Sequence, residues 1–391
     1  MGRSNLSPAE NNHQTYHSDA PVLNYVFLTY KSSQQALAER TQMTQEPFLS
    51  FLMPVYNAEK DLSAALDSIV SQDDGTIELI CVNDGSKDSS DSILQDYAQR
   101  YPFIKVINQE NQGITCARDN ALAAASGTWI CFVDNDDIIA HDAVNVMHAQ
   151  ADDTCDIIYF QYSKFTTALP DESDNSVGSI RYFKDGDITK LQSDCINRFR
   201  DNTPLVPHTV LPTPWAKIYK RAFLAEYGLE FRREVTHEED VTFNFEVLSH
   251  VTRAKAVDYV LYYYRWSVSS ESHRYRPHIF DSTQKTLAAY RDIIHRCYPN
   301  RSDIADLYKY RVMWELQYCV YLGPMHRLNP APYTERRKQF NRLLESEPYK
   351  GILSQINPLR FEPKQALLAA LIKYRQFWLL NIIGKIVDKT R

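Results

Sequence analysis

The chain has 391 residues, of which 44% are apolar and 24% are charged, and its formal net charge is −6. This composition is that of a globular protein with two or three domains and enough apolar material for a sizeable core. The net negative charge excludes a protein that coats nucleic acid over its whole surface, and we expect no nucleic-acid partner.

The cysteines and the N-terminus point to a cytoplasmic protein. The seven cysteines are widely spaced and none belongs to a CxxC pair, so we expect reduced thiols rather than a zinc site or a disulfide framework. Residues 1–47 begin with a polar stretch that lacks the apolar core of a signal peptide, and we expect a partly disordered N-terminal extension. No run of about 18 apolar residues occurs, so no membrane-spanning helix is predicted.

Strands and helices alternate from residue 47 to residue 133. The apolar pattern predicts strands at 47–53, 77–82, 103–107 and 128–133, with helices at 59–71, 88–100 and 113–125. Such alternation is typical of right-handed βαβ units, and it predicts an α/β fold with a mostly parallel sheet flanked by helices. Ligands of such sheets bind beyond the carboxyl ends of the strands, so the loops there are expected to hold the site.

The pattern after residue 150 is less regular. It predicts a strand at 155–160, a helix near 187–200, a helix at 239–249, and two strands within 253–265. The rest of 161–212 is expected to form turns. From residue 278 to the end the apolar spacing is helical and is interrupted at prolines, which predicts a helical C-terminal region over 276–391.

Two aspartates follow the fourth predicted strand. Asp134 and Asp136 alternate along the chain, and alternate residues at a strand end project the same way. Two carboxylates in one cleft repel each other unless a cation lies between them, and oxygen ligands suit Mg²⁺ or Mn²⁺. The alternative is that an aspartate here caps the next helix. We expect Asp137 to be a cap or a supporting group rather than a ligand.

The polar segments that follow the four strands carry a resemblance to a known family. In chain order they are PVYN (54–57), NDGS (83–86), NQG (111–113) with Arg118 behind it, and DNDD (134–137). Together with HEEDVTF (237–243), this ordered set resembles a family 2 glycosyltransferase of the GT-A fold, of the bacterial type that builds capsule, exopolysaccharide or lipopolysaccharide. The resemblance is strong over 48–160 and fair over 211–273.

The resemblance implies a GT-A, Rossmann-like catalytic domain over 48–275. Its first half, 48–160, would hold a nucleotide-sugar donor, with a UDP-sugar favoured, and its second half, 161–275, would hold the acceptor. In the first half the resemblance assigns the base and ribose pocket to Pro54, Val55 and Tyr56, the base itself to Asp84, and a nucleotide contact to Arg118.

The resemblance also implies a metal site. Asp134 and Asp136 would form the DxD motif, which binds ribose and metal diphosphate, and Asp136 is the better candidate ligand. His273 would approach the same metal. The alternative is that His273 is an ordinary loop residue. The family often has an A-R-N triplet, whereas here Arg118 is followed by Asp119, which adds a negative charge near the site.

On the acceptor side the resemblance assigns the catalytic base to Asp240. The acceptor hydroxyl must lose its proton as it attacks the anomeric carbon, and one displacement inverts that centre. Glu239, beside the base, would belong to the acceptor-binding residues, Trp215 would stack on the acceptor sugar, and Arg265 would neutralise the leaving group. The alternatives are a solvated acidic helix start for Glu239 and Asp240, a packed core position for Trp215, and a surface ion pair for Arg265.

The C-terminal region carries the opposite charge to the rest. Residues 281–391 hold 19 Lys and Arg against 10 Asp and Glu, a net of +9, which leaves −15 for the other residues. Within 364–391, apolar residues share one helical stripe among six basic residues. This pattern predicts either a helix lying on an anionic membrane or a terminal helix packed on its own domain or on a second copy of the chain.

The sequence therefore predicts an inverting, metal-dependent glycosyltransferase that acts on a saccharide or lipid-linked acceptor, either free in the cytoplasm or bound at the cytoplasmic face of the membrane. A nucleotidyltransferase is an alternative, but PVYNAEK lacks a glycine-rich phosphate loop. A non-catalytic binding scaffold is another, and the intact DxD motif and Asp240 argue against it. The donor sugar, the linkage and the existence of a homo-oligomer stay open.

Overall fold

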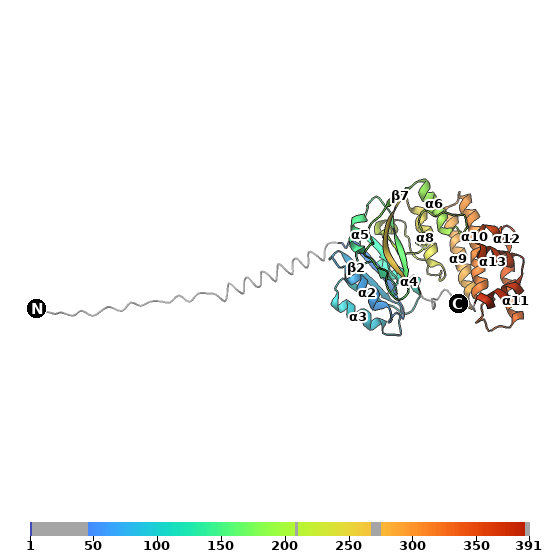
Figure 1. Cartoon of the computed structure of the whole chain (residues 1–391), viewed down its shortest axis with the longest axis horizontal. Coiled ribbons are helices and arrows are strands. Elements are labelled where there is room, and N and C mark those ends of the chain that lie inside the picture. The colour runs from blue at the N-terminus through green and yellow to red at the C-terminus, as the bar shows by residue number, and fades with distance from the viewer. Residues whose placement is uncertain (2–45, 208–209, 267–274, 388–391) are drawn as a thin grey trace. The chain divides into compact units, whose positions relative to one another are not determined.

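The computed structural model describes residues 46–207, 210–266 and 275–387, together with Met1 (Figure 1). The expected N-terminal extension, 1–47, lies almost wholly outside these residues. Residues Pro47–Arg391 form one compact unit, which holds all the elements below.

The parallel sheet predicted for the first half is confirmed. Strands β1 (Leu49–Val55), β2 (Ile77–Asn83), β3 (Ile104–Asn108) and β4 (Trp129–Phe132) lie in the order β3-β2-β1-β4, and all three pairings are parallel. The connecting helices are α2 (Leu62–Val70), α3 (Ser90–Arg100) and α4 (Ile114–Ala124). Every residue of β1 and β2 is buried, as expected of central strands that are covered on both faces.

The second half extends the sheet beyond β4. The order continues β4-β8-β6-β9-β5, with β7 paired to β9, and β4–β8 and β6–β8 are antiparallel whereas β6–β9 is parallel. The strands are β5 (Ile138–Ile139), β6 (Ile157–Phe165), β7 (Ile180–Lys184), β8 (Lys217–Lys220) and β9 (Arg253–Arg265). Helices α5 (Ala143–Gln150), α6 (Gly186–Ile196), α7 (Arg221–Glu226) and α8 (Glu239–His250) lie between them in the chain.

The prediction of two strands within 253–265 is wrong, because β9 is one long strand. Asp258 interrupts the apolar pattern but stays in the strand. Its amide donates to the carbonyl of Ser179 over 2.9 Å, and its carbonyl accepts from Gly178 over 2.8 Å. Strand β7 was not predicted, since four of its five side chains are exposed and leave no apolar alternation.

The predicted helical region is confirmed. It consists of α9 (Ile279–Cys297), α10 (Ser302–Leu322), α11 (Tyr333–Glu345), α12 (Tyr349–Leu353), the short η2 (Pro358–Arg360), α13 (Pro363–Lys373) and α14 (Phe377–Val387). Helix α9 contacts α8 and α10 contacts α6, so two helices of the second half join this region to the sheet (Figure 1).

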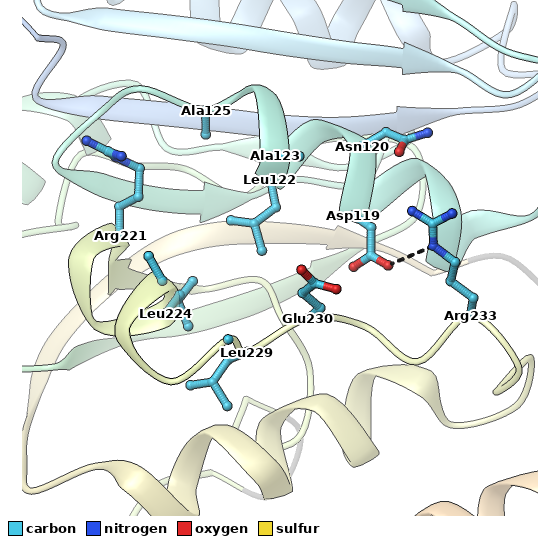
Figure 2. Close-up of a pocket in the computed structure, with 12 residues that line it drawn as sticks. Asp119, Asn120, Leu122, Ala123, Ala125, Arg221, Leu224, Leu229, Glu230 and Arg233 are labelled. Carbon is cyan, nitrogen blue, oxygen red and sulfur yellow. Dashed lines mark ion pairs between the residues drawn. The ribbon is translucent and has the colours of Figure 1, made fainter.

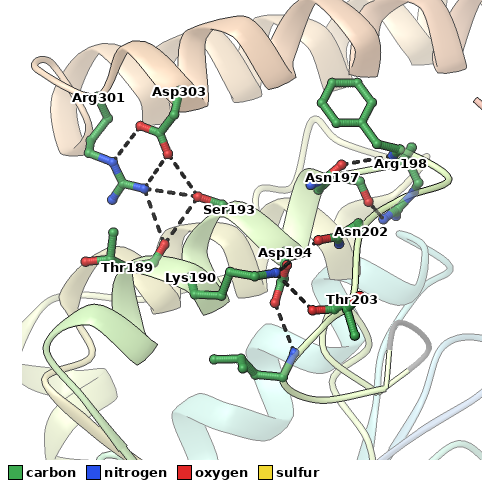
Figure 3. A network of polar contacts seen from close by, with 12 residues as sticks. Thr189, Lys190, Ser193, Asp194, Asn197, Arg198, Asn202, Thr203, Arg301 and Asp303 are labelled. Carbon is green, nitrogen blue, oxygen red and sulfur yellow. Dashed lines mark hydrogen bonds and ion pairs between the residues drawn. The ribbon is translucent and has the colours of Figure 1, made fainter. Parts of the chain in front are cut away.

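Polar contacts reinforce the joint between α6 and α10 (Figure 3). The guanidinium of Arg301 lies 2.7 Å from the carboxylate of Asp303 and 3.1 Å from the hydroxyl of Ser193. Ser193 itself donates to Asp303 over 3.0 Å. The start of α10 is therefore fixed to one face of α6. One turn earlier on α6, Lys190 donates to the side chain of Asn202 over 3.0 Å, a contact that does not involve α10.

The apolar stripe predicted over 364–391 does not form one helix. Helix α13 ends at Lys373 and α14 begins at Phe377, and Arg375 between them has a φ of 59°. A left-handed residue breaks a right-handed helix, so the stripe is divided. Ile372 and Leu380 are fully buried, which agrees with packing on the chain's own helices. Within the described ranges, no helix is both long and apolar enough to cross a bilayer.

A close approach between the connection before β4 and β1 requires glycine at position 127. The amide of Gly127 donates to the Ser50 hydroxyl over 2.8 Å and to the buried carboxylate of Glu78 over 3.1 Å. A Cβ at this position would lie 2.6 Å from the backbone nitrogen of Ser50. Backbone atoms within a central strand cannot move aside cheaply, so a side chain here would strain the sheet.

We therefore expect Gly127→Ala to lower the free energy of unfolding by about 1–3 kcal/mol, as overpacking in cores does. Gly186→Ala is the matched control, because a Cβ at Gly186 meets nothing within 4 Å and alanine favours the α6 helix. Urea unfolding followed by circular dichroism measures both. Equal stability of the two variants would contradict the close approach.

Candidate active site

Hydrogen bonds join the loops at the carboxyl ends of β1 to β4 into one surface. The side chain of Asn135 donates to the carbonyl of Pro54 over 2.8 Å, and the amide of Asp84 donates to the carbonyl of Val55 over 2.9 Å. The carboxylate of Asp84 accepts from two backbone amides of the loop after β3, over 2.8 and 2.9 Å. The four polar segments therefore meet at one edge of the sheet.

The residues expected around a nucleotide base differ in exposure. Pro54 and Val55 are buried, whereas Tyr56 is 49% exposed at the same edge. Asp84 is buried, and both of its oxygens accept hydrogen bonds from the loop after β3. Tyr56 thus offers the largest surface to a ligand, while Asp84 shapes the loop. Base binding by these residues stays a prediction.

Arg118 on α4 bridges the two halves of the site. Its buried side chain places Nη2 3.0 Å from Asp134 Oδ1 and Nη1 3.2 Å from Glu239 Oε1. The Phe231 ring centre lies 5.5 Å from the guanidinium. Burial alone would lower the pKa of Arg118, but the carboxylates of Asp134 and Glu239 outweigh it and raise that pKa. The charge of Arg118 therefore holds Asp134 and Glu239 close together.

Strand β9 supports the 134–137 turn from the other side. The hydroxyl of Tyr262 accepts from the amide of Asp134 over 3.1 Å and donates to the carboxylate of Asp137 over 2.7 Å. The backbone amide of Arg265 donates to the other oxygen of Asp137, also over 2.7 Å. Asp137 is 1% exposed. It is therefore the supporting group that the sequence predicted.

The turn has the donor set of a divalent-cation site. Although Asp136 is exposed, the protein atoms around its carboxylate, and then the charge of Asp134, raise the pKa of Asp136 to about 6. Burial first, and then Asp134 and Asp136, raise the pKa of Asp137 to about 8. A hard cation would relieve this repulsion, and carboxylates are suitable ligands for Mn²⁺ or Mg²⁺. Asp136 and Asp134 therefore fit such an ion.

Arg265 lies beside the same turn. Its Nε is 2.8 Å from the carbonyl oxygen of Asp136 and 3.5 Å from the carboxylate of Asp61, and its guanidinium stands over the Phe165 ring at 4.5 Å. The pair with Asp61 is the ion pair that the alternative interpretation expects. Contact with a leaving group stays a prediction. His273 lies outside the described residues.

Glu239 and Asp240 open helix α8 opposite the turn. Asp240 is half-buried, and its Oδ1 accepts from the amide of Val241 over 2.8 Å. Burial first, and then the charge of Glu239, raise the pKa of Asp240 to about 7, while Arg118 opposes the shift. A carboxyl group with a pKa near neutrality is suited to accept a proton. The structure thus gathers Asp240, Glu239, Arg118 and Asp134 in one place.

Trp215 and Lys217 belong to the second half of the domain, over 161–275, and both are buried. Trp215 is 5% exposed, and its ring stacks on Tyr262 at 4.7 Å and on Tyr264 at 5.7 Å, as the packed-core alternative predicts. A sugar contact for Trp215 stays a prediction.

Lys217 is fully buried and donates to two carbonyls of the preceding loop, over 2.6 and 3.0 Å. The sequence assigned no role to Lys217, because its partners are backbone carbonyls without a sequence signature.

Other supporting residues were also missed. Asn135 lies within the DNDD segment, so its position was available, but its bond to the β1 loop depends on the fold. Tyr262 lies in a run of three tyrosines, and only the strand register shows which of them reaches the turn. Asp61 belongs to the PVYNAEKD stretch and pairs with Arg265 across 204 positions of the chain.

Asp119 follows Arg118 on α4 but has other partners, and a negative charge near the site stays a prediction. Neighbouring helical residues point in different directions, and Arg118 already faces inward. Asp119 accepts from the amide of Phe231 over 2.8 Å and lies 3.6 Å from Arg233 Nε. Asp119 lines a separate cavity of about 330 Å³, and Glu230 is a second acidic residue in the wall of that cavity (Figure 2).

Known proteins resemble this chain in sequence. Residues 50–226 match the model described as glycosyl transferase family 2. The putative glycosyltransferase EpsH of Bacillus subtilis (strain 168) is 30% identical over 348 residues, which cover 85% of this chain and 93% of EpsH. The poly(ribitol-phosphate) beta-glucosyltransferase of Bacillus spizizenii is 28% identical over 224 residues, 55% of this chain and 32% of that protein.

A solved structure agrees with the fold. S. aureus TarS 1–349 in complex with UDP-GlcNAc has a TM-score of 0.57 at 17% identity, over 88% of this chain and 92% of that chain. The protein is therefore an enzyme of the glycosyltransferase class with a GT-A fold. It belongs to glycosyl transferase family 2, as the sequence predicted.

The raised pKa of Asp240 predicts a stability effect that depends on pH. A carboxyl group whose pKa rises on folding stabilises the fold fully below its unfolded pKa, and this contribution is lost as the pH rises through about 7. Asp240→Asn should therefore raise the melting temperature by roughly 2 °C or more at pH 8, and by less at pH 5, where only part of the contribution is lost. Differential scanning fluorimetry without metal or nucleotide measures this.

Asp153→Asn is the control, because the Asp153 side chain is 87% exposed and should show no such trend. If both variants changed equally between pH 5 and pH 8, the pKa of Asp240 would not be raised in the folded protein.

Proposed function

We propose that this enzyme transfers a sugar from a nucleotide-sugar, with a UDP-sugar favoured, to a hydroxyl group of a saccharide or lipid-linked acceptor, and inverts the anomeric centre. The observation that carries the proposal is the Arg118 bridge. It joins Asp134 of the turn after β4 to Glu239, which lies directly before Asp240. A diphosphate-binding edge and a proton acceptor therefore lie on the two sides of one buried cation.

The relatives support the same choice of substrates. The TarS structure contains UDP-GlcNAc, and the Bacillus spizizenii relative is named for glucosyl transfer to poly(ribitol-phosphate). We therefore assign the donor to the half over 48–160, the acceptor to the half over 161–275, and the pathway to the synthesis of a surface polysaccharide. The enzyme would act in the cytoplasm, where its reduced thiols are stable.

Asp240 is the proposed base. Its pKa of about 7 lets it accept the proton of the acceptor hydroxyl near neutral pH and release it afterwards. Arg118 keeps Glu239 paired, which limits the repulsion between Glu239 and Asp240. On the donor side, Asp136 and Asp134 would hold Mn²⁺ or Mg²⁺, which when bound neutralises the charge of the departing diphosphate. Arg265 lies beside Asp136 and is the proposed second cation for the diphosphate.

The test compares two variants. A donor screen with UDP- and GDP-sugars, followed by mass spectrometry of the released nucleotide, identifies a working donor. With that donor, Asp240→Asn should lower kcat by about 100-fold or more, since removal of a general base has effects of this order. Asp136→Ala should in addition weaken metal-dependent binding of UDP, measured by calorimetry with Mn²⁺.

Asp153→Asn serves as the surface control and should behave like the wild type. Full activity of both Asp240→Asn and Asp136→Ala would refute the mechanism. Binding of UDP and Mn²⁺ by the wild type without transfer to any acceptor would instead favour a non-catalytic scaffold.

The C-terminal region is the proposed contact with a membrane. Trp378 is 54% exposed and Ile382 is 45% exposed on α14, and the region around them has a net positive charge over 281–391. Exposed aromatic and aliphatic side chains among basic residues are typical of proteins that bind the surface of an anionic bilayer. Such contact would bring the active site to a lipid-linked acceptor.

A double variant tests this proposal without removing the buried part of the helix. Trp378→Asp with Ile382→Asp should abolish flotation with vesicles that contain phosphatidylglycerol, while Leu169→Asp, which changes an equally exposed apolar residue, should not. Flotation of the wild type should be weak with neutral vesicles, and it should be weak with anionic vesicles at high salt. If the wild type stays unbound with anionic vesicles, the membrane proposal is wrong.

A further inference from the structure

The turn before α8 has an unfavourable backbone conformation. Glu238, which precedes Glu239 and Asp240, has φ 56° and ψ 35°, in the left-handed region. A residue with a Cβ is disfavoured there, and it persists only where the surroundings fix it. The contacts that fix Glu238 therefore also set where Glu239 and Asp240 lie.

Helix α10 holds the side chains of this turn through a buried cation. Arg311 is fully buried and pairs with the carboxylate of Glu238. The same guanidinium lies 3.1 Å from Glu315 Oε1, and Glu315 Oε2 lies 3.0 Å from His237 Nε2. His237 also stacks on the Tyr318 ring at 4.9 Å. Two consecutive residues of the turn are therefore bound to one helix of the C-terminal region.

Helix α9 contacts both the main chain and the side chains of the same turn. The hydroxyl of Thr286 donates to the carbonyl of His237 over 2.6 Å. The hydroxyl of Tyr290 donates to the Glu238 carboxylate over 3.4 Å, and Thr236 donates to Ser282 over 3.3 Å. The turn is thus held on both its side chains and its main chain by residues that lie outside the 50–226 range of the family match.

Arg311 also explains why acidic groups can gather here. Ligand atoms of His237, Glu238 and Glu315 lie within 4.8 Å of one another, which is a spacing that a metal ion would also accept. The guanidinium of Arg311 contacts both glutamates, so the positive charge at this position is an arginine. Carboxylates buried in this way need a partner, and loss of the partner would release the turn.

We propose that Arg311 is a positioning residue for the catalytic base, with Glu315 as its support. It holds Glu238 in the left-handed conformation, so that Glu239 reaches Arg118 and Asp240 faces the donor side. The inference rests on the proposed function, because it takes Asp240 to be the base. It makes the helical region a part of the active-site framework, although none of its described residues is assigned to substrate.

The experiment compares Glu238→Gln and Arg311→Lys with Glu246→Gln. Glu246 lies further along α8, is 16% exposed against 17% for Glu238, and pairs with Arg296 of α9 over 2.5 Å. It therefore matches Glu238 in exposure and partner type, but it lies far along the helix from the base. We expect Glu238→Gln and Arg311→Lys to lower kcat by about 10- to 100-fold, as small misplacements of reacting groups do.

The KM for the UDP-sugar and the calorimetric Kd of UDP with Mn²⁺ should stay within about two-fold in these variants, because the pair of Arg118 with Asp134 does not involve the substituted residues. Glu246→Gln should keep all these values. Hydrogen exchange of the amides over 237–243 should be faster in Glu238→Gln and Arg311→Lys than in Glu246→Gln. If Arg311→Lys folds poorly, the comparison of Glu238→Gln with Glu246→Gln tests the positioning role.

Asp240→Asn separates the assignment of Asp240 as the base from the positioning role of Arg311. If Asp240→Asn is inactive while Glu238→Gln and Arg311→Lys match Glu246→Gln in kcat and exchange, the positioning role is overturned and the proposed function stands. If Asp240→Asn is fully active, the assignment of the base fails and the positioning role fails with it. A loss of kcat with unchanged donor binding in Glu238→Gln supports the proposal.

Discussion

A guanidinium that is removed from water must be surrounded by negative charge, and the site is organised around this requirement at Arg118. Arg118 stands at the inner side of α4 and contacts Asp134 on one side and Glu239 on the other. Without these carboxylates the buried charge would destabilise the fold strongly. Two segments that are distant in sequence are thereby fixed to one point, and the site follows from that junction.

The same region accumulates acids that the fold does not favour in their charged form. The pKa values of Asp136, Asp137 and Asp240 are all raised, with loss of hydration as the largest cause. Such a cluster lowers stability at neutral pH when no ligand is present. Hydrogen bonds from Tyr262 and from the backbone of Arg265 hold the turn against the repulsion between its carboxylates.

The parts that the sequence predicted are those with a local signature. The four strands of the first half, their loops and the acidic pair Asp134 and Asp136 could be identified because period-two and period-3.6 patterns and turn residues lie next to each other in the chain. The unity of β9, the strand β7 and the pairing of Asp61 with Arg265 could not be. Each depends on pairing or packing with segments far away in the chain, which leaves no mark on the local pattern.

The turn clamped by α9 and α10 limits how this enzyme can be recombined. A chimera that joins residues 48–275 of this chain to the helices of another family member would lose the guanidinium that contacts Glu238, unless the donor helix supplied an arginine at the place of Arg311. The second half of the sheet and the C-terminal helices are therefore not independently exchangeable modules. Redesign of the half over 161–275 has to treat residues 236–240 and the faces of α9 and α10 that cover them as one unit.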